Sequence, residues 1–90
     1  MSAVSREVLI DNIRGLHARA SAKFVNLAAG LDADVEVEKD GTRVTGTSIM
    51  GLMMLGAAKG DTIVIHASGT DAEGALKQLV ELVEDRFGED

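Results

Sequence analysis

Apolar residues recur along this sequence at two spacings, every second residue in some stretches and every third or fourth in others. The alternation of Val8 and Ile10 with polar neighbours predicts a strand from about Ser5 to Ile10. The spacing becomes helical from His17 and stops at Gly30, which suits the C-terminal cap of a helix. The apolar stripe of this helix consists of Ala20, Phe24, Leu27 and Ala28. A strand followed by an amphipathic helix is therefore expected in the first third of the chain.

A β-hairpin is expected over residues 33–45, ADVEVEKDGTRVT. Val35 and Val37 alternate there with Glu36 and Glu38, which is the pattern of a strand with one buried and one wet face. The Asp-Gly pair that follows is favoured in tight type I′ turns, which join antiparallel strands. Both strands of the hairpin should therefore lie in the same sheet.

Three further elements are expected in the second half of the chain. Residues 46–60 contain leucines among glycines, which predicts a short and interrupted helix. Residues 62–68, TIVIHAS, predict a strand whose buried face is Ile63, Ile65 and Ala67. The last helix has one apolar face, made of Ala72, Leu76, Leu79, Val80, Val83 and Phe87. Thr70 and Glu73 at its start have the spacing of a capping box.

These elements give the order β-α-β-β-α-β-α in one domain over residues 1–90. Because the strands have one apolar and one polar face, the economical arrangement is an α+β open-faced sandwich of two layers. In it, a four-stranded antiparallel sheet carries all helices on one face. The opposite face of the sheet should be exposed to solvent and should carry Glu36, Glu38 and His66.

Composition limits what such a domain can do. With 90 residues, 46% hydrophobic content, two phenylalanines and no tyrosine or tryptophan, the chain can build one aliphatic core and no deep cleft. It has no cysteine, so disulfide and thiolate chemistry are excluded, which is compatible with a reducing compartment. No stretch has the pattern of a signal peptide or the length of a membrane span, and a cytoplasmic protein is expected.

The net charge of −6 is spread unevenly along the chain. Residues 1–30 carry four basic side chains against two acidic ones, whereas residues 71–90 carry two against seven. The basic residues of the first segment are Arg6, Arg14, Arg19 and Lys23. An acidic chain with no basic stripe and few aromatic residues is a poor candidate for binding nucleic acid. The local basic patch suits a small anion or an acidic protein surface.

His17 is the residue whose position points most clearly to chemistry. At the N-cap of the predicted helix it meets unpaired backbone amides and the positive end of the helix dipole, which together form an anion site. Gly15 allows a tight turn before it, and Arg19 offers a guanidinium fork to phosphate oxygens. Positive surroundings favour the neutral imidazole, and an exposed neutral ring can attack phosphorus. The spacing permits a phosphohistidine site but leaves open that His17 is only a polar capping residue.

Other chemistries have no motif to support them. GAAKGDT lacks the ending of a phosphate-binding P-loop, and two distant histidines without cysteine give no metal site. No pair of carboxylates flanks His17 in the sequence, so hydrolysis by a general acid and base is not expected. No cofactor is expected, and no insertion into a membrane.

Two blocks of the sequence resemble the HPr family, the phosphocarriers of the bacterial phosphotransferase system, and especially its nitrogen-related branch, NPr. GLHARASAKFV, residues 15–25, is similar to the family's active-site signature. TGTSIMGLMMLGAAKGDTIVIHASG, residues 45–69, is similar to its serine-containing helix and last strand. The resemblance spans about residues 5–87 and implies the same two-layer fold.

On this resemblance His17 is the phosphorylated residue. It takes a phosphoryl group on Nδ1 from phosphorylated Enzyme I and passes it to a histidine of an EIIA-type protein. Arg19 and the backbone amides of Ala18 and Arg19 steady the phosphate, and Arg14 adds a second positive charge. The family usually has proline where Ala20 stands, so the first turn of the helix lacks that stiffening here.

The resemblance also marks Ser48, which matches a regulatory site phosphorylated by HPr kinase in some lineages. A serine before a helix equally serves as an ordinary N-cap. The surface that docks Enzyme I and EIIA is implied to comprise Ile49, Met50, Met53, Ala20 and Lys23. The three members on the short helix are expected to be partly exposed, because flexible thioethers suit a surface that accepts several partners. Assigned to the core or its edge are Leu52, Met54 and Leu55.

Two functions follow from these interpretations. The first is a monomeric relay that is phosphorylated for a short time, with most of the catalysis supplied by Enzyme I rather than by the chain as a stand-alone enzyme. The second is a regulatory adaptor, whose phosphorylation state controls a kinase, a transporter or a transcriptional partner. The similarity of TSIMGLMML to the nitrogen-related branch favours regulation over sugar transport as the final use of the phosphate.

Overall fold

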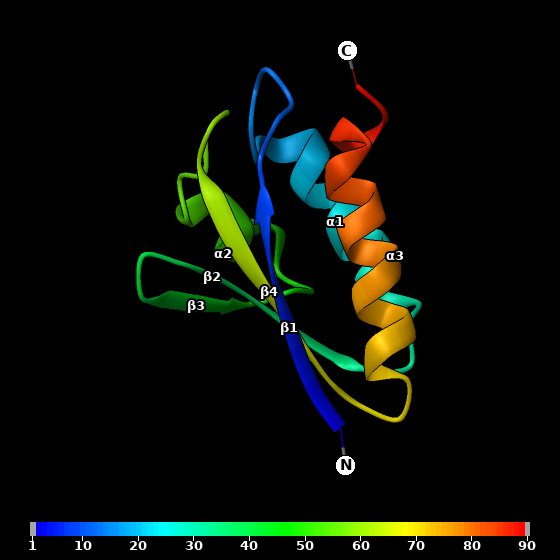
Figure 1. Ribbon diagram of the computed structural model, residues 1–90. Coiled ribbons are helices and arrows are strands. Elements are labelled where there is room, and N and C mark those ends of the chain that lie inside the picture. Colours follow the sequence, from blue (N-terminus) through cyan, green and yellow to red (C-terminus); the bar gives the residue numbers. More distant parts are fainter. Residues whose placement is uncertain (1, 90) are drawn as a thin grey trace.

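The computed structural model describes residues 2–89, and its elements follow the predicted order. They are β1 Ser2–Leu9, α1 Ala18–Ala29, β2 Asp34–Lys39, β3 Thr42–Thr45, α2 Ile49–Met54, β4 Thr62–Gly69 and α3 Ala72–Glu84. A short 3₁₀ helix, Arg86–Gly88, follows α3. The strands form one 4-stranded antiparallel sheet in the order β1-β4-β2-β3 (Figure 1). β1 begins before the expected Ser5, because β4 pairs with it as far as Ser2 opposite Gly69.

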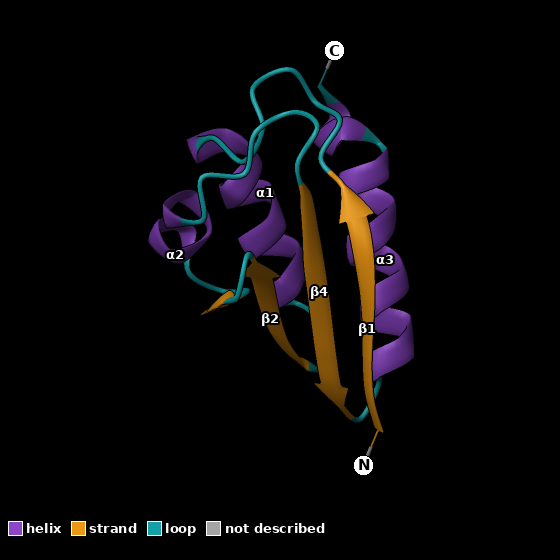
Figure 2. Cartoon of the chain, turned by 60° about the vertical axis from the view of Figure 1, so that its left-hand side comes forward, coloured by secondary structure: helices purple, strands orange, loops and turns teal. Residues whose placement is uncertain are grey.

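The helices cover one face of the sheet, as the alternation of the strands predicts (Figure 2). α1 and α3 contact each other, and α2 packs against α1 and β3. Both layers contribute fully buried side chains to the core, among them Phe24, Val37, Leu52, Ile63, Ile65, Leu79, Val80 and Val83. Burying a side chain of this size stabilises a fold by about 1.5–3 kcal/mol relative to leaving it in water. The predicted two-layer α+β fold is confirmed.

The hairpin between β2 and β3 turns at the predicted Asp-Gly pair. Asp40 and Gly41 have φ angles of 51° and 84°, so both central residues adopt the left-handed conformation that a type I′ turn requires. The flanking residues Lys39 and Thr42 pair directly across the two strands. The predicted turn is therefore consistent with the observed register of this hairpin.

The opposite face of the sheet is open and polar, as expected. His66 is 24% exposed in its side chain, because its Nε2 lies 2.8 Å from Oε1 of Glu38 on the neighbouring strand. Arg43 donates from Nε to Glu36 at 3.0 Å on the same face. A hollow of about 670 Å³ lies here, lined in part by Ser5 and His66. Because α1 covers the other face of the sheet, His66 takes no part in the surroundings of His17.

Two expectations about α3 are wrong. The predicted capping box of Thr70 and Glu73 does not form, because the N-cap is Asp71, and its side chain makes no cap hydrogen bond. The Asp71 amide donates instead to the carbonyl of Asp32 at 3.0 Å, which fixes the point at which the chain turns into the helix. At the other end, the helix stops at Glu84 and does not reach Phe87.

Candidate active site

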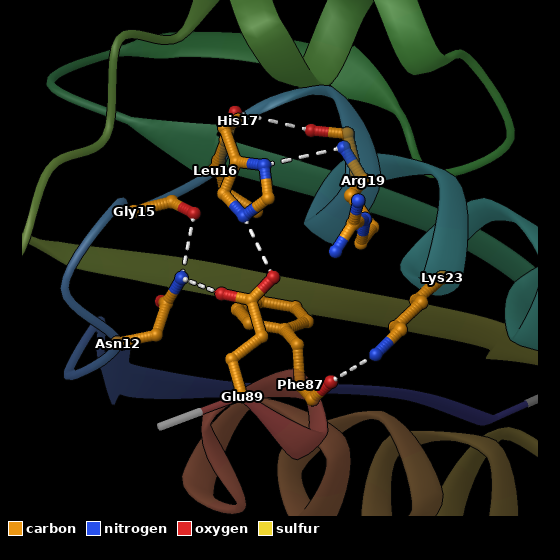
Figure 3. A network of polar contacts seen from close by, with 9 residues as sticks. Asn12, Gly15, Leu16, His17, Arg19, Lys23, Phe87 and Glu89 are labelled. Carbon is orange, nitrogen blue, oxygen red and sulfur yellow. Dashed lines mark hydrogen bonds and ion pairs between the residues drawn. The ribbon is translucent and has the colours of Figure 1, made fainter.

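The His17 ring caps the first turn of α1. The residue has an extended backbone, with φ −73° and ψ 179°, and its Nδ1 accepts a hydrogen bond from the Arg19 amide at 3.3 Å (Figure 3). The predicted N-cap position of His17 is confirmed. Nδ1 can accept this bond only when it carries no proton. Its lone pair is then also available for nucleophilic attack.

A carboxylate that sequence reasoning missed contacts the other nitrogen of the ring. Oε2 of Glu89 lies 2.7 Å from Nε2 of His17, and the two side chains are only 15% and 16% exposed (Figure 3). The ring is therefore more covered than the sequence predicts. Glu89 lies 72 positions further along the chain, so no local pattern links the two residues. One indirect signal exists in the sequence: Phe87 is a large apolar residue close to Glu89, which indicates that this segment packs against the domain.

Asn12 ties the loop before His17 to the same carboxylate. Its side chain is fully buried, and Nδ2 donates to the Gly15 carbonyl at 2.8 Å and to Oε1 of Glu89 at 3.1 Å. Among residues 2–89, Oδ1 of Asn12 has no hydrogen-bond partner. If the side-chain amide were flipped, Oδ1 would face the Gly15 carbonyl and Oε1 of Glu89, and both of these oxygens can only accept hydrogen bonds. The observed orientation, with Nδ2 facing them, is therefore the favourable one.

Gly15 shapes the loop as predicted. Its φ of +64° lies in the left-handed region, and a Cβ at this position would lie 2.4 Å from the Ala57 carbonyl oxygen. That oxygen accepts a hydrogen bond from the Leu16 amide at 2.9 Å, so the close approach holds the loop in place. A residue with a side chain would therefore push His17 away from the end of α1.

Three cations line a depression at the edge of the site, next to Glu89. Arg14, Arg19 and Lys23 line a shallow depression of about 410 Å³, together with Ile13, Gly88 and Glu89. Lys23 donates from Nζ to the Phe87 carbonyl at 2.7 Å. For the guanidinium groups of Arg14 and Arg19, the structure of residues 2–89 records no hydrogen bond or ion pair, so both are available to an anion. Three of the four basic residues of the first segment therefore converge on one place, whereas Arg6 lies elsewhere and contacts Glu84.

The surroundings of Glu89 keep its side chain ionised. Partial burial by itself raises the pKa of its carboxyl group, but hydrogen bonds from Asn12 and His17 and the positive charge of Lys23 outweigh this effect and lower the pKa. A carboxyl pKa that folding lowers stabilises the folded state at neutral pH. This contribution is lost as the pH falls from the ordinary value of about 4.3 through the lowered one.

The residues of α2 form an exposed apolar surface. Ile49, Met50 and Met53 are 39%, 70% and 41% exposed, as predicted, whereas Leu52 and Leu55 are buried. Two assignments are wrong. Met54 is 80% exposed rather than part of the core or its edge, and it is the last residue of the six-residue helix. Ala20 is 0% exposed and cannot contact a partner, because it lies on the stripe of α1 that faces the core.

Ser48 is the N-cap of α2, and its removal should weaken that helix. Its hydroxyl oxygen accepts a hydrogen bond from the Gly51 amide at 2.9 Å. We expect Ser48→Ala to lower the free energy of unfolding by about 1 kcal/mol, because the amide loses its acceptor. Thr47→Ala removes an exposed neighbouring hydroxyl and should change it by less than about 0.5 kcal/mol. Urea unfolding monitored by circular dichroism measures both, and equal effects would show that the cap contributes nothing.

Fold and site together define a class of small α+β proteins that present one histidine at a helix N-terminus, with a shallow depression lined by cations close by. Residues 4–85 match the sequence model of the PTS-HPr family, described as the PTS HPr component phosphorylation site. The chain therefore belongs to the HPr family of phosphocarrier proteins of the phosphotransferase system. Over the described residues, no helix is long and apolar enough to cross a membrane.

Named relatives agree with this assignment. The phosphocarrier protein HPr of Neisseria meningitidis serogroup A is 45% identical over 86 residues, covering 96% of this chain and 97% of its own. The phosphocarrier protein NPr of Shewanella violacea is 37% identical over 89 residues, covering 99% and 98%. The crystal structure of HPr-C-His from Thermoanaerobacter tengcongensis has a TM-score of 0.87 and 44% identity, and covers 100% and 99% of the two chains.

Proposed function

We propose that His17 is the residue that carries the phosphoryl group, on Nδ1, from phosphorylated Enzyme I to an EIIA-type protein. The single observation that carries the proposal is the position of the ring as the N-cap of α1, with Nδ1 directed at the Arg19 amide. A phosphoryl group on this nitrogen lies where the amides at the start of a helix lack intrahelical acceptors. The same geometry suits both acceptance and release of the phosphoryl group, because the backbone amides stabilise its negative charge through hydrogen bonds alone.

The transfer needs only a small change at the ring. In the resting geometry the lone pair of Nδ1 is engaged by the Arg19 amide at a long 3.3 Å, a contact that little energy is needed to break. When Nδ1 turns toward phosphorus, the amides of Ala18 and Arg19 become donors to the phosphoryl oxygens. The guanidinium of Arg19 provides a charged fork to these oxygens, and Arg14 adds a second positive charge from the rim of the depression.

Ala20 stands where the family usually has a proline, directly after Arg19. Other contacts hold the first turn of α1 in place. Ala20 is buried, and the fully buried Ser21 donates from its hydroxyl to the Leu16 carbonyl at 3.2 Å. Gly15 lies against the chain at Ala57. These contacts hold the start of α1 from both sides, so alanine leaves the site ordered.

The docking surface combines the exposed apolar residues of α2 with the basic rim of Arg14, Arg19 and Lys23. Small interfaces with an apolar centre and charged rim favour fast and transient complexes, as a relay requires. Met54 extends this surface, since it is the most exposed large apolar residue of α2. Phosphorylation of Ser48 by an HPr kinase would add negative charge beside the same surface and weaken docking of an acidic partner.

Incubation with Enzyme I and labelled phosphoenolpyruvate tests the proposal. The intact protein should take up label that is stable in alkali and labile in acid, and peptide mapping should place it on His17. Subsequent addition of an EIIA-type protein should remove the label from this chain. Label on another residue, or no label at all, would contradict the proposal.

A further inference from the structure

The C-terminal strap, defined as residues 85–89, folds back over His17. Arg86, Phe87 and Gly88 have φ angles of 56°, 55° and 74°, so the chain makes a left-handed turn directly after α3. Phe87 is 1% exposed and anchors this turn in the core, and Lys23 holds its carbonyl at 2.7 Å. A non-glycine residue in the left-handed region costs about 1–3 kcal/mol, so the strap is held in its conformation by the structure around it.

The strap delivers one charged group to the ring. Oε2 of Glu89 contacts Nε2 of His17 at 2.7 Å, while Oε1 accepts from Asn12 at 3.1 Å (Figure 3). Because both carboxylate oxygens are engaged and the side chain is largely covered, Glu89 is held in one orientation before any partner arrives. Such an arrangement is unlike an exposed surface ion pair, whose side chains must be ordered first.

We propose that Glu89 is a positioning residue for phosphoryl transfer, which keeps the proton of the His17 ring on Nε2 and its lone pair on Nδ1. This inference rests on the proposed function of His17. An ionised carboxylate can only accept, so its contact requires a proton on Nε2. The Arg19 amide can only donate, so its contact requires a free lone pair on Nδ1. The two contacts, made by distant parts of the chain, select the same neutral tautomer.

Glu89 should also stabilise the charge that the His17 ring acquires on phosphorylation. Nδ1 of His17 attacks phosphorus with its lone pair, and the bond between phosphorus and the donor breaks, returning its electron pair to the donor. No proton moves, so the ring keeps its proton on Nε2 and becomes positively charged. Glu89 faces that charge at 2.7 Å and stabilises the phosphorylated ring. A carboxylate that holds an imidazole and balances its charge is an arrangement known from catalytic triads.

Glu89→Gln tests the role with little change of shape. A glutamine amide can either accept from a protonated Nε2 or donate to an unprotonated one, so it no longer selects a tautomer. In the intact chain, ¹⁵N NMR above the titration range of the ring should show the Nε2–H tautomer for His17, and the variant should show a mixture. The rate of phosphoryl transfer from Enzyme I should fall about tenfold, which is the lower end of the loss seen when a group that orients a metal-ligating histidine is removed.

The matched control is Glu84→Gln, which removes the same charge from the same end of the chain. Glu84 contacts Arg6 at 3.5 Å on an exposed face, and neither side chain touches His17. The control should keep the Nε2–H tautomer and the transfer rate of the intact chain. An unchanged tautomer and rate in Glu89→Gln would overturn the inference, and so would a faster rate, which would make the strap an inhibitory clasp. If the intact chain takes up no label, the proposed function of His17 itself fails, a result separate from either of these.

Discussion

Replacement of His17 with alanine is expected to reduce phosphoryl acceptance from Enzyme I to the background of the assay. The variant has no nucleophilic nitrogen at the end of α1, whereas the amides and the arginines that would hold the phosphate are unchanged. Because the ring also caps α1, alanine should lower the free energy of unfolding by about 1 kcal/mol. His17→Asn separates the two effects, since asparagine caps helices well and offers no ring nitrogen. Both variants should be inactive, and the asparagine variant should be the more stable.

The matched control for this prediction is His66→Ala. His66 is the second histidine of the chain and also contacts a glutamate, Glu38, but lies on the open face of the sheet. Phosphoenolpyruvate, Enzyme I and each variant are incubated together, and acid-labile label is counted over time. The His66 variant should accept label at the rate of the intact chain. Label on His17→Asn would place the phosphoryl group on another residue and contradict the site described above.

Phe87→Ala should produce the largest loss of stability of any substitution near the site. Phe87 is 1% exposed and fills the space beneath the strap, and loss of such a ring typically lowers the free energy of unfolding by about 3–5 kcal/mol. A domain of this size loses about 4–8 °C in Tm for each kcal/mol. Thermal unfolding by calorimetry measures the change, with Met54→Ala as the control. Met54 is of similar bulk but 80% exposed, so its removal should change the free energy by less than about 0.5 kcal/mol.

Phe87→Ala also tests whether the packing of the strap holds Glu89 against His17. Without the Phe87 anchor, the left-handed turn loses its support, and Glu89 should leave His17 in a large fraction of molecules. The ¹⁵N signals of His17 should then show both neutral tautomers below the unfolding temperature, as in Glu89→Gln. A Phe87→Ala protein as stable as Met54→Ala would show that the strap is not packed as described.

Local chemistry accounts for the features of the fold that were predicted correctly. The Asp-Gly pair specifies a type I′ turn through two residues that accept a positive φ, and the alternating valines and glutamates of β2 specify which face is buried. The N-cap positions of His17 and Ser48 follow from where the helical spacing begins. Each of these signals lies within a few residues of the feature it determines.

Features that depend on distant contacts were predicted wrongly or not at all. The start of α3 depends on a hydrogen bond between Asp71 and Asp32, which overrides the capping box that neighbouring residues suggest. The apolar spacing of α1 placed Ala20 on the buried stripe correctly, and only its assignment to the docking surface, which came from the family resemblance, was wrong. Met54 is exposed instead of lying at the core or its edge, because burial depends on which side of a short helix faces the core. Apolar spacing gives that direction poorly in a helix of only six residues such as α2.

The sequence by itself determined the order of the elements, the two-layer sheet and a histidine at a positive helix end, because periodicity, turns and caps act over one or two turns of chain. Only the tertiary structure decided what faces the second nitrogen of that histidine. Glu89 reaches it through a buried Phe87 and a left-handed turn, across 72 positions of sequence. The choice of tautomer is thus made by packing at the far end of the chain, which no local pattern encodes.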